Sequence, residues 1–148
     1  MRFLVACIAA AIAVHLTGCG FDLASLEDYP NSESVYLGTF NTPVPPTVTN
    51  LTASGSAFRD SSTCYLKFDA TLATVNSITL NSFTPTSAAT FNSEANGSAE
   101  ARWWKPTDTP TTTYYASTTF HPTFSSGNAY MSHDTATNTT YLYWFGWD

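Results

Sequence analysis

The chain has 148 residues and a formal net charge of −6, with 11% charged and 15% aromatic residues. This length suits one domain with a real core, and many aromatics with few charges argue against a disordered chain. The few Lys and Arg residues are scattered, which excludes the basic footprint needed for a nucleic-acid backbone. No nucleic-acid partner is expected.

The N-terminal segment has the order of charge and hydropathy found in secretory signal peptides. Arg2 adds a positive charge beside the N-terminal amine, and residues 3–16 are apolar except for His15. This apolar run is shorter than the roughly 20 residues that a membrane-spanning helix needs. We therefore expect a targeting segment rather than a membrane-spanning anchor.

The segment ends in Leu16-Thr17-Gly18-Cys19, which resembles the lipobox of bacterial lipoproteins. The resemblance is confined to residues 1–20. It implies cleavage between Gly18 and Cys19 and a diacylglycerol thioether on the Cys19 thiol. Because each buried methylene contributes about 0.8 kcal/mol, two or three acyl chains would hold the domain at the membrane. Lipoproteins kept at an inner membrane commonly carry aspartate after the cysteine, and Gly20 at that position favours the outer membrane of a two-membrane cell.

An ordinary signal peptide that leaves a soluble secreted protein is the alternative. In a eukaryote, the sequons at Asn50, Asn96 and Asn138 would then matter. The state of the cysteines depends on whether Cys19 is lipidated, because without lipidation a Cys19–Cys64 disulfide becomes possible. Cys64 alternates with Leu66 and Phe68, which favours a buried structural thiol over a nucleophile.

Residues 1–18 are thus expected to form the signal peptide, residues 19–33 a tether, and residues 34–148 a β-rich domain. Strands are predicted at 34–40, 47–53, 63–69, 75–81, 99–104, 111–120, 128–132 and 139–145. Turns are expected at Ser54-Gly55-Ser56 and Asn96-Gly97, and residues 83–94 are expected to be a loop with one short strand near Thr90-Phe91. No helical periodicity is sustained after residue 30. The predicted fold class is all-β, a single small antiparallel β-sandwich or barrel.

Aromatic residues are the main candidates for ligand binding. Trp103 and Trp104 should point to opposite faces of their strand. On the last strand, Tyr141, Tyr143 and Phe145 should face one way, and Leu142 and Trp144 the other. Exposed Trp104 and Tyr143 could stack on a sugar ring or contact an envelope protein. The favoured interpretation is that such aromatics build the core of a charge-poor domain.

Titratable residues give no assembled site. His121, His133 and Asp134 could in principle bind zinc, but nothing in the sequence places them together, and Asp commonly bonds loop amides. Glu100 and Asp108 could be imagined as the two carboxylates of a glycosidase, but the sequence supplies no separation to test, and Glu100 with Arg102 is more simply a charge pair on the solvent face. The sequence has no phosphate loop, nucleophile elbow or metalloprotease motif. It implies no catalytic residue, no metal ligand and no cofactor.

The sequence therefore predicts a lipid-anchored protein of the bacterial cell envelope with a non-enzymatic structural or binding role. Its partners would be the membrane, through Cys19, and a glycan or envelope protein. The alternative is a carbohydrate- or ligand-binding β module that uses exposed aromatics, and a third interpretation is a secreted hydrolase.

Overall fold

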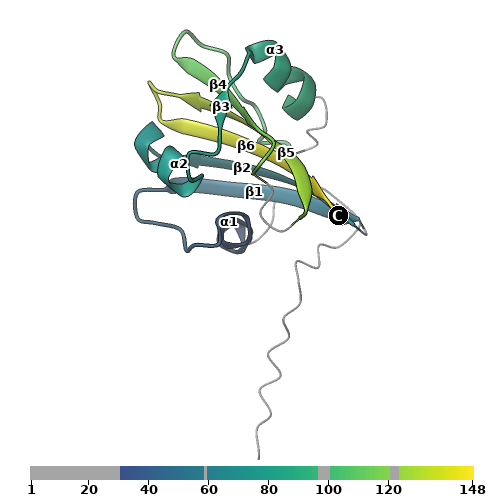
Figure 1. The fold of residues 1–148 in the computed structure, drawn as a ribbon. Helices are drawn as coiled ribbons and strands as arrows, with labels where there is room; N and C mark the ends of the chain where they lie inside the picture. The colour runs from purple at the N-terminus through teal and green to yellow at the C-terminus, as the bar shows by residue number, and fades with distance from the viewer. Residues whose placement is uncertain (1–30, 59, 97–100, 121–123) are drawn as a thin grey trace, which may run out of the picture.

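The computed structural model describes residues 31–58, 60–96, 101–120 and 124–148 (Figure 1). Within these ranges the elements are α1 (Ser32–Phe40), β1 (Thr49–Phe58), β2 (Ser61–Asp69), α2 (Leu72–Ile78), β3 (Thr84–Pro85), α3 (Ala88–Phe91), the π-helical turn η1 (Asn92–Asn96), β4 (Thr112–Ser117), β5 (Ser126–Asp134) and β6 (Thr139–Trp147). The described strands form one antiparallel sheet in the order β1-β2-β6-β5-β4-β3. The fold is mostly β, as predicted. The expected sandwich or barrel is wrong, because the sheet is open and helices, rather than a second sheet, cover it.

Two hairpins build most of the sheet. The β5–β6 hairpin pairs Met131 with Leu142 and confirms the predicted pairing of the last two strands. The β1–β2 hairpin pairs Gly55 with Cys64, so the turn expected at Ser54-Gly55-Ser56 is wrong and these residues lie inside β1. A Cβ at Gly55 would lie 2.7 Å from the Thr63 carbonyl oxygen. Glycine is therefore needed here for the close approach of two backbones.

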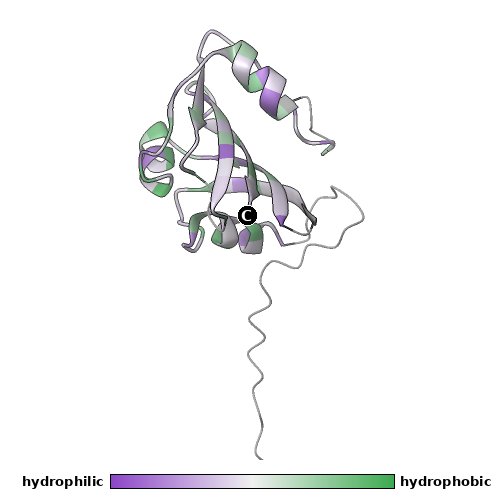
Figure 2. Ribbon diagram, turned by 45° about the vertical axis from the view of Figure 1, so that its right-hand side comes forward, coloured by the Kyte–Doolittle hydropathy of each residue, from purple (hydrophilic) through white to green (hydrophobic). Residues whose placement is uncertain are grey.

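One face of the sheet carries the larger core. Side chains alternate along strands, and this face receives Cys64, Leu66 and Phe68 from β2, as the sequence pattern predicts. The other described members of this buried cluster are Val35, Tyr36, Val48, Ala53, Ala70, Val75, Ala129, Met131, Leu142 and Trp144. They come from the sheet, from the residues that flank β1 and β2 (Val48 and Ala70), and from α1 and α2, which lie on the same side of the sheet (Figure 2).

The opposite face is aromatic. Its buried cluster consists of Tyr65, Phe91, Ala95, Ala101, Trp104, Tyr141, Tyr143, with Trp103, Tyr114, Tyr130 and Phe145 packed against it. α3 contributes Phe91 and lies over this face (Figure 2). The alternation predicted for the last strand is confirmed, since Tyr141 and Tyr143 belong to this cluster and Leu142 and Trp144 to the other.

The strand predicted at 34–40 is wrong, because this segment is helix α1. The side chain of Asn31 accepts a hydrogen bond from the Ser34 amide at 3.2 Å, which caps the start of the helix. Asn41, with a φ of 51°, closes the end by donating from its amide to the Leu37 carbonyl. The helix begins two residues before the expected domain boundary at residue 34.

The strand predicted at 75–81 is also wrong, because helix α2 and its C-terminal turn occupy this segment. The Thr71 hydroxyl caps the helix by accepting from the Thr74 amide. Ile78 and Leu80 were expected to point inward and Thr79 outward. Instead, Thr79 is 1% exposed and Leu80 is 85% exposed.

The strand predicted at 99–104 is not present in its described part. Residues 101–104 form a turn in which the Trp104 amide donates to the Ala101 carbonyl at 3.0 Å, and residues 99 and 100 lie outside the described residues. The short strand expected near Thr90-Phe91 is wrong as well. That segment is helix α3, which is capped by Ser87.

Candidate functional site

The proposed lipidation residue, Cys19, and the proposed cleavage site between Gly18 and Cys19 lie outside the described residues. The structure does place the start of the domain. Ser32, at the beginning of α1, accepts a hydrogen bond at its Oγ from the Ala53 amide of β1 at 3.1 Å. Residues 20–30 can span at most roughly 40 Å. The chain coming from Cys19 therefore enters the domain beside β1, which is one edge of the sheet.

The aromatic face is organised around Trp104. Its ring centroid lies 4.9 Å from that of Tyr65 and 5.4 Å from that of Tyr141, in edge-to-face geometry. Trp103 lies 6.0 Å away, also edge to face, and Phe91 of α3 lies 6.5 Å away. Such arrangements stabilise aromatic cores. The two neighbouring tryptophans are thus in ring contact and do not point to opposite faces of a strand.

Trp104 and Tyr143, the candidates for an exposed binding platform, are 7% and 8% exposed, in line with the favoured interpretation that such aromatics build the core. Tyr143 stacks on Tyr130, with centroids 6.2 Å apart, and contacts Tyr65 at 5.0 Å. The two rings are packed inside the aromatic layer, so they offer no exposed platform. Trp147, at the end of β6, is more accessible at 38%.

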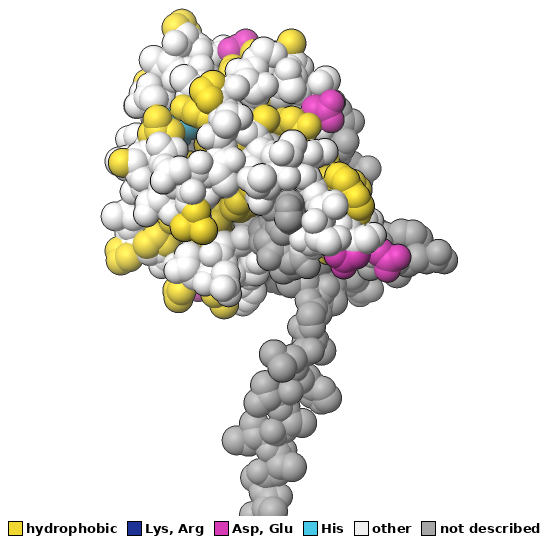
Figure 3. Space-filling model, viewed as in Figure 1, with side chains coloured by type: hydrophobic (Ala, Val, Ile, Leu, Met, Phe, Trp, Pro, Cys, Tyr) yellow, Lys and Arg dark blue, Asp and Glu magenta, His cyan; other side chains and the backbone are white. Residues whose placement is uncertain are grey.

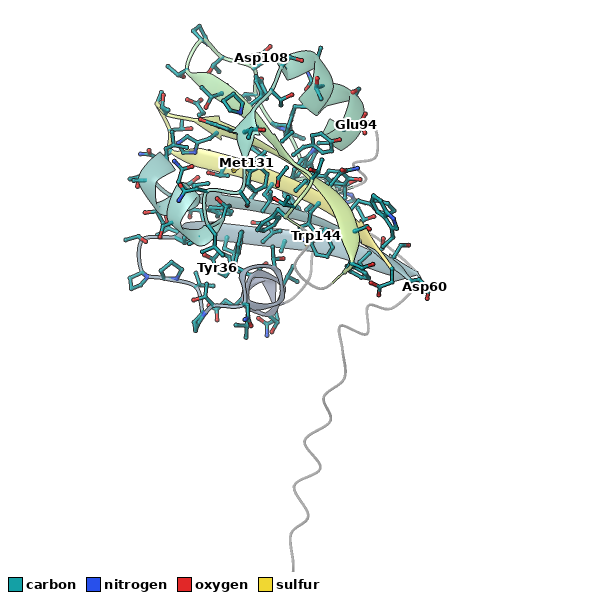
Figure 4. The ribbon with its side chains drawn as sticks, viewed as in Figure 1. Tyr36, Asp60, Glu94, Asp108, Met131 and Trp144 are labelled. Atoms are coloured by element: carbon teal, nitrogen blue, oxygen red, sulfur yellow. The ribbon has the colours of Figure 1, made fainter. Side chains whose placement is uncertain are left out.

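Two acidic residues, Glu94 and Asp108, help to raise the pKa of tyrosine side chains in this aromatic cluster. Glu94 and Asp108 lie at the end of the molecule opposite Tyr36 (Figure 4). The Tyr114 hydroxyl donates to Asp108 Oδ1 at 2.9 Å, and burial together with this bond raises the pKa of Tyr114 to about 12. Burial, reinforced by the Glu94 carboxylate, also raises the pKa of Tyr143. Both phenols therefore stay protonated at neutral pH, and that of Tyr114 donates to Asp108. Glu100, the suggested partner of Asp108, lies outside the described residues.

His133 is fully buried on β5. Its Nδ1 lies 2.9 Å from the Thr140 hydroxyl of β6, and its Nε2 has no hydrogen-bond partner among the described residues. Burial lowers the pKa of His133, while the Asp134 carboxylate opposes part of that effect. The imidazole is therefore neutral near pH 7. His121 lies outside the described residues.

Asp134 organises the turn that follows β5. Its Oδ1 accepts from the Thr111 hydroxyl at 2.7 Å and from the Ala136 amide at 2.9 Å. These two bonds, that of Thr111 first, lower the pKa of Asp134. The residue thus bonds a loop amide, as expected for Asp at a loop start.

A groove that the sequence does not predict lies between the ends of α1 and α2. It has a volume of about 280 Å³ and is lined by Thr39, Phe40, Asn41, Ile78, Thr79, Leu80, Ser82, Thr119 and Phe120. Hydrophobic side chains gather on the surface where α2 approaches α1 (Figure 3). Leu80 stands on the rim of this groove with most of its side chain in solvent. The sequence offers no signal for it, since three distant segments contribute.

The described part of the chain has no group of three His, Cys, Asp or Glu side chains that could hold a metal ion. None of the described helices combines the length and hydropathy required to cross a membrane. No protein-family model matches the chain, and neither the curated proteins nor the solved structures give a significant match.

Proposed function

We propose that this protein is a bacterial envelope lipoprotein, anchored by lipid on Cys19, whose β domain has a non-enzymatic structural or binding role. The observation that carries the proposal is Leu16-Thr17-Gly18-Cys19 at the end of an apolar segment. Only a thiol gives the thioether that holds the diacylglycerol. In a cell with two membranes, Gly20 after the cysteine favours the outer membrane.

The position of Cys64 supports the lipid anchor over a disulfide. Its side chain is 1% exposed and packs in the core on the Leu66 and Phe68 face. A disulfide from Cys19 would have to reach a thiol that the folded domain covers. The burial of Cys64 therefore favours lipid over a disulfide on the Cys19 thiol.

The hydrogen bonds of the titratable candidates support a non-enzymatic role. His133 is hydrogen-bonded to the Thr140 hydroxyl inside the sheet. Asp134 accepts hydrogen bonds from the Thr111 hydroxyl and the Ala136 amide. Both side chains thus have structural uses. A ligand-binding role based on Trp104 or Tyr143 would require α3 and its neighbours to uncover the aromatic layer, since both rings are buried.

The anchor can be tested by lipid labelling of the full chain in a bacterial host. Cells that express the wild-type protein and are fed a radioactive or alkyne fatty acid should label it, and it should sediment with membranes. Cys19→Ala should abolish the label and release the domain from membranes. Cys64→Ala is the matched control and should retain both properties. Equal labelling of wild type and Cys19→Ala would contradict the proposal.

Membrane sorting is tested by Gly20→Asp. In a host with two membranes, the wild-type protein should fractionate with the outer membrane, and the variant should be retained at the inner one. If the wild-type protein already resides in the inner membrane, the outer-membrane part of the proposal is wrong while the anchor stands.

A further inference from the structure

The turn after α2 holds an apolar residue in a conformation that apolar residues avoid. Leu80 has a φ of 52° and Asn81 one of 54°, both in the left-handed region. The Asn81 amide donates to the Asn76 carbonyl at 2.9 Å, and the Leu80 amide to the Ser77 carbonyl at 3.3 Å. These two bonds form a Schellman cap, in which the Leu80 position is usually glycine because glycine has no Cβ to strain.

The cap itself makes no use of the leucine side chain. Its stabilising bonds come from backbone groups, and the positions that often make a hydrophobic contact across such a cap are here Asn76 and Asn81. Leu80 is 85% exposed, so it adds little to the core. The chain therefore accepts both backbone strain and an exposed apolar side chain at one position. Such an outlier points to a function outside the fold of the single chain.

The groove beside Leu80 is apolar at its base. Phe40, Ile78 and Phe120 line it, and the Phe40 and Phe120 rings contact each other with centroids 5.8 Å apart. Its volume of about 280 Å³ can accommodate a leucine side chain. A projecting apolar side chain and an apolar hollow thus lie side by side on one surface.

A surface of this kind is complementary to itself. In a two-fold dimer the same patch is used by both subunits, so a projection on each copy can enter the hollow of the other. The groove is also uncharged, since its described lining residues include no Asp, Glu, Lys or Arg. Two copies of a chain with a net charge of −6 can meet at this patch without placing like charges against each other.

We propose that a second copy of this chain binds at this surface, with Leu80 of each copy seated between Phe40, Ile78 and Phe120 of the other. The patch is small, which corresponds to a weak and reversible dimer. This inference goes beyond the proposed anchor and does not depend on it.

The dimer can be tested by cross-linking the full chain in the whole lysate of an expressing host, with membranes and soluble fraction kept together. Ser82→Cys places a thiol on the groove rim, whereas the thiol of Cys64 is buried. A short bismaleimide should then give a covalent species of twice the chain mass. Ser93→Cys, an exposed position beyond α3, is the matched control and should give little. The chain without an added cysteine gives the background yield of cross-linked product. Any cross-linking through an unlipidated Cys19, which would contradict the anchor, appears in this background and is measured separately.

Leu80→Asn is the decisive variant. Asparagine tolerates a positive φ, so the turn is kept while the apolar projection is lost. In the Ser82→Cys background this change should lower the cross-linked yield at least about tenfold, a loss of 1.4 kcal/mol. Leu37→Asn, at an exposed leucine of α1 that does not line the groove, should leave the yield unchanged. Unchanged cross-linking in Leu80→Asn, no yield above Ser93→Cys, or a product with a different protein would each overturn the proposal.

Discussion

The Nδ1 atom of His133 lies 2.9 Å from the Oγ1 atom of Thr140, and both side chains are fully buried between two central strands. The Nε2 atom has no hydrogen-bond partner among the described residues. A proton added at Nε2 would place a charge in the core, where the described groups offer it no acceptor.

This burial predicts a domain that loses stability in mild acid. The pKa of His133 is below its usual value of 6.5 in the folded state, so the unfolded chain binds the proton more readily. The stabilisation is fully present above about pH 6.5 and is lost as the pH falls below that value, by at most about 1.4 kcal/mol per pH unit. Urea unfolding between about pH 7.5 and about pH 5 measures it. His133→Gln should flatten this dependence, and an equal slope in the variant would assign it to other groups.

Leu80→Gly should stabilise the domain. Glycine removes the strain of the left-handed backbone, and little buried surface is lost because the leucine is exposed. We expect a gain of about 1 kcal/mol. The same substitution at Leu37, inside α1, should cost about 1 kcal/mol. Thermal unfolding of the two variants should therefore move in opposite directions, and a loss at both positions would show that Leu80 contributes to folding.

Thr39→Val should loosen the attachment of α1 to the sheet. The Trp144 indole nitrogen donates to the Thr39 hydroxyl at 3.3 Å, and both residues are buried. Valine has nearly the same shape but no acceptor, so the indole N–H is left unsatisfied at a cost of about 1 to 3 kcal/mol. Urea unfolding followed by tryptophan fluorescence measures the loss. Thr47→Val at an exposed position provides the control, and equal effects of the two would contradict the role of this bond.

Two glycines should respond differently to alanine. At Gly55 the new Cβ would lie 2.7 Å from the Thr63 carbonyl oxygen, which is backbone of the paired strand. At Gly146 it would lie 2.6 Å from Cδ2 and 2.9 Å from Cγ of Phe124, so the whole Phe124 side chain would have to shift, but no backbone atom of a paired strand is struck. Gly55→Ala should cost about 1 to 3 kcal/mol and Gly146→Ala less. Unfolding midpoints that rank in the reverse order would contradict the geometry at the hairpin.

The sheet was the more predictable part of the fold. Alternation at Cys64, Leu66 and Phe68 correctly gave a core face, and the pattern of the last two strands gave their hairpin. These strands are long and paired on both sides, so the alternation of side chains between the two faces continues along their whole length. The number of sheets was not predictable, because helices and a second sheet can both cover an apolar face.

The helices were missed for a physical reason. α1 and α2 have nine and seven residues, which is too short for a helical period to dominate, and both contain β-prone residues such as Val35 and Val75. Side-chain caps from Asn31 and Thr71 and burial against the sheet decide the outcome. Around Leu80, alternation gave the wrong face because a helix end, rather than a strand, sets the orientation.

The candidate site was predictable only as a list of residue types. Trp104 and Tyr143 were correctly identified as aromatics that could belong to a core, but their mutual packing depends on α3 and on the turn at residues 101–104. The groove at Leu80 joins segments separated by up to about 80 positions, so no local pattern reveals it.

The mass of the mature N-terminal peptide tests the central claim most directly. The protein should be purified from membranes of a bacterial host, digested, and examined by mass spectrometry. We predict a peptide that begins at Cys19 and carries diacylglycerol on its thiol, with or without acylation of its amine. A peptide that begins elsewhere, or a Cys19 that is unmodified or bonded to Cys64, would contradict the lipid anchor.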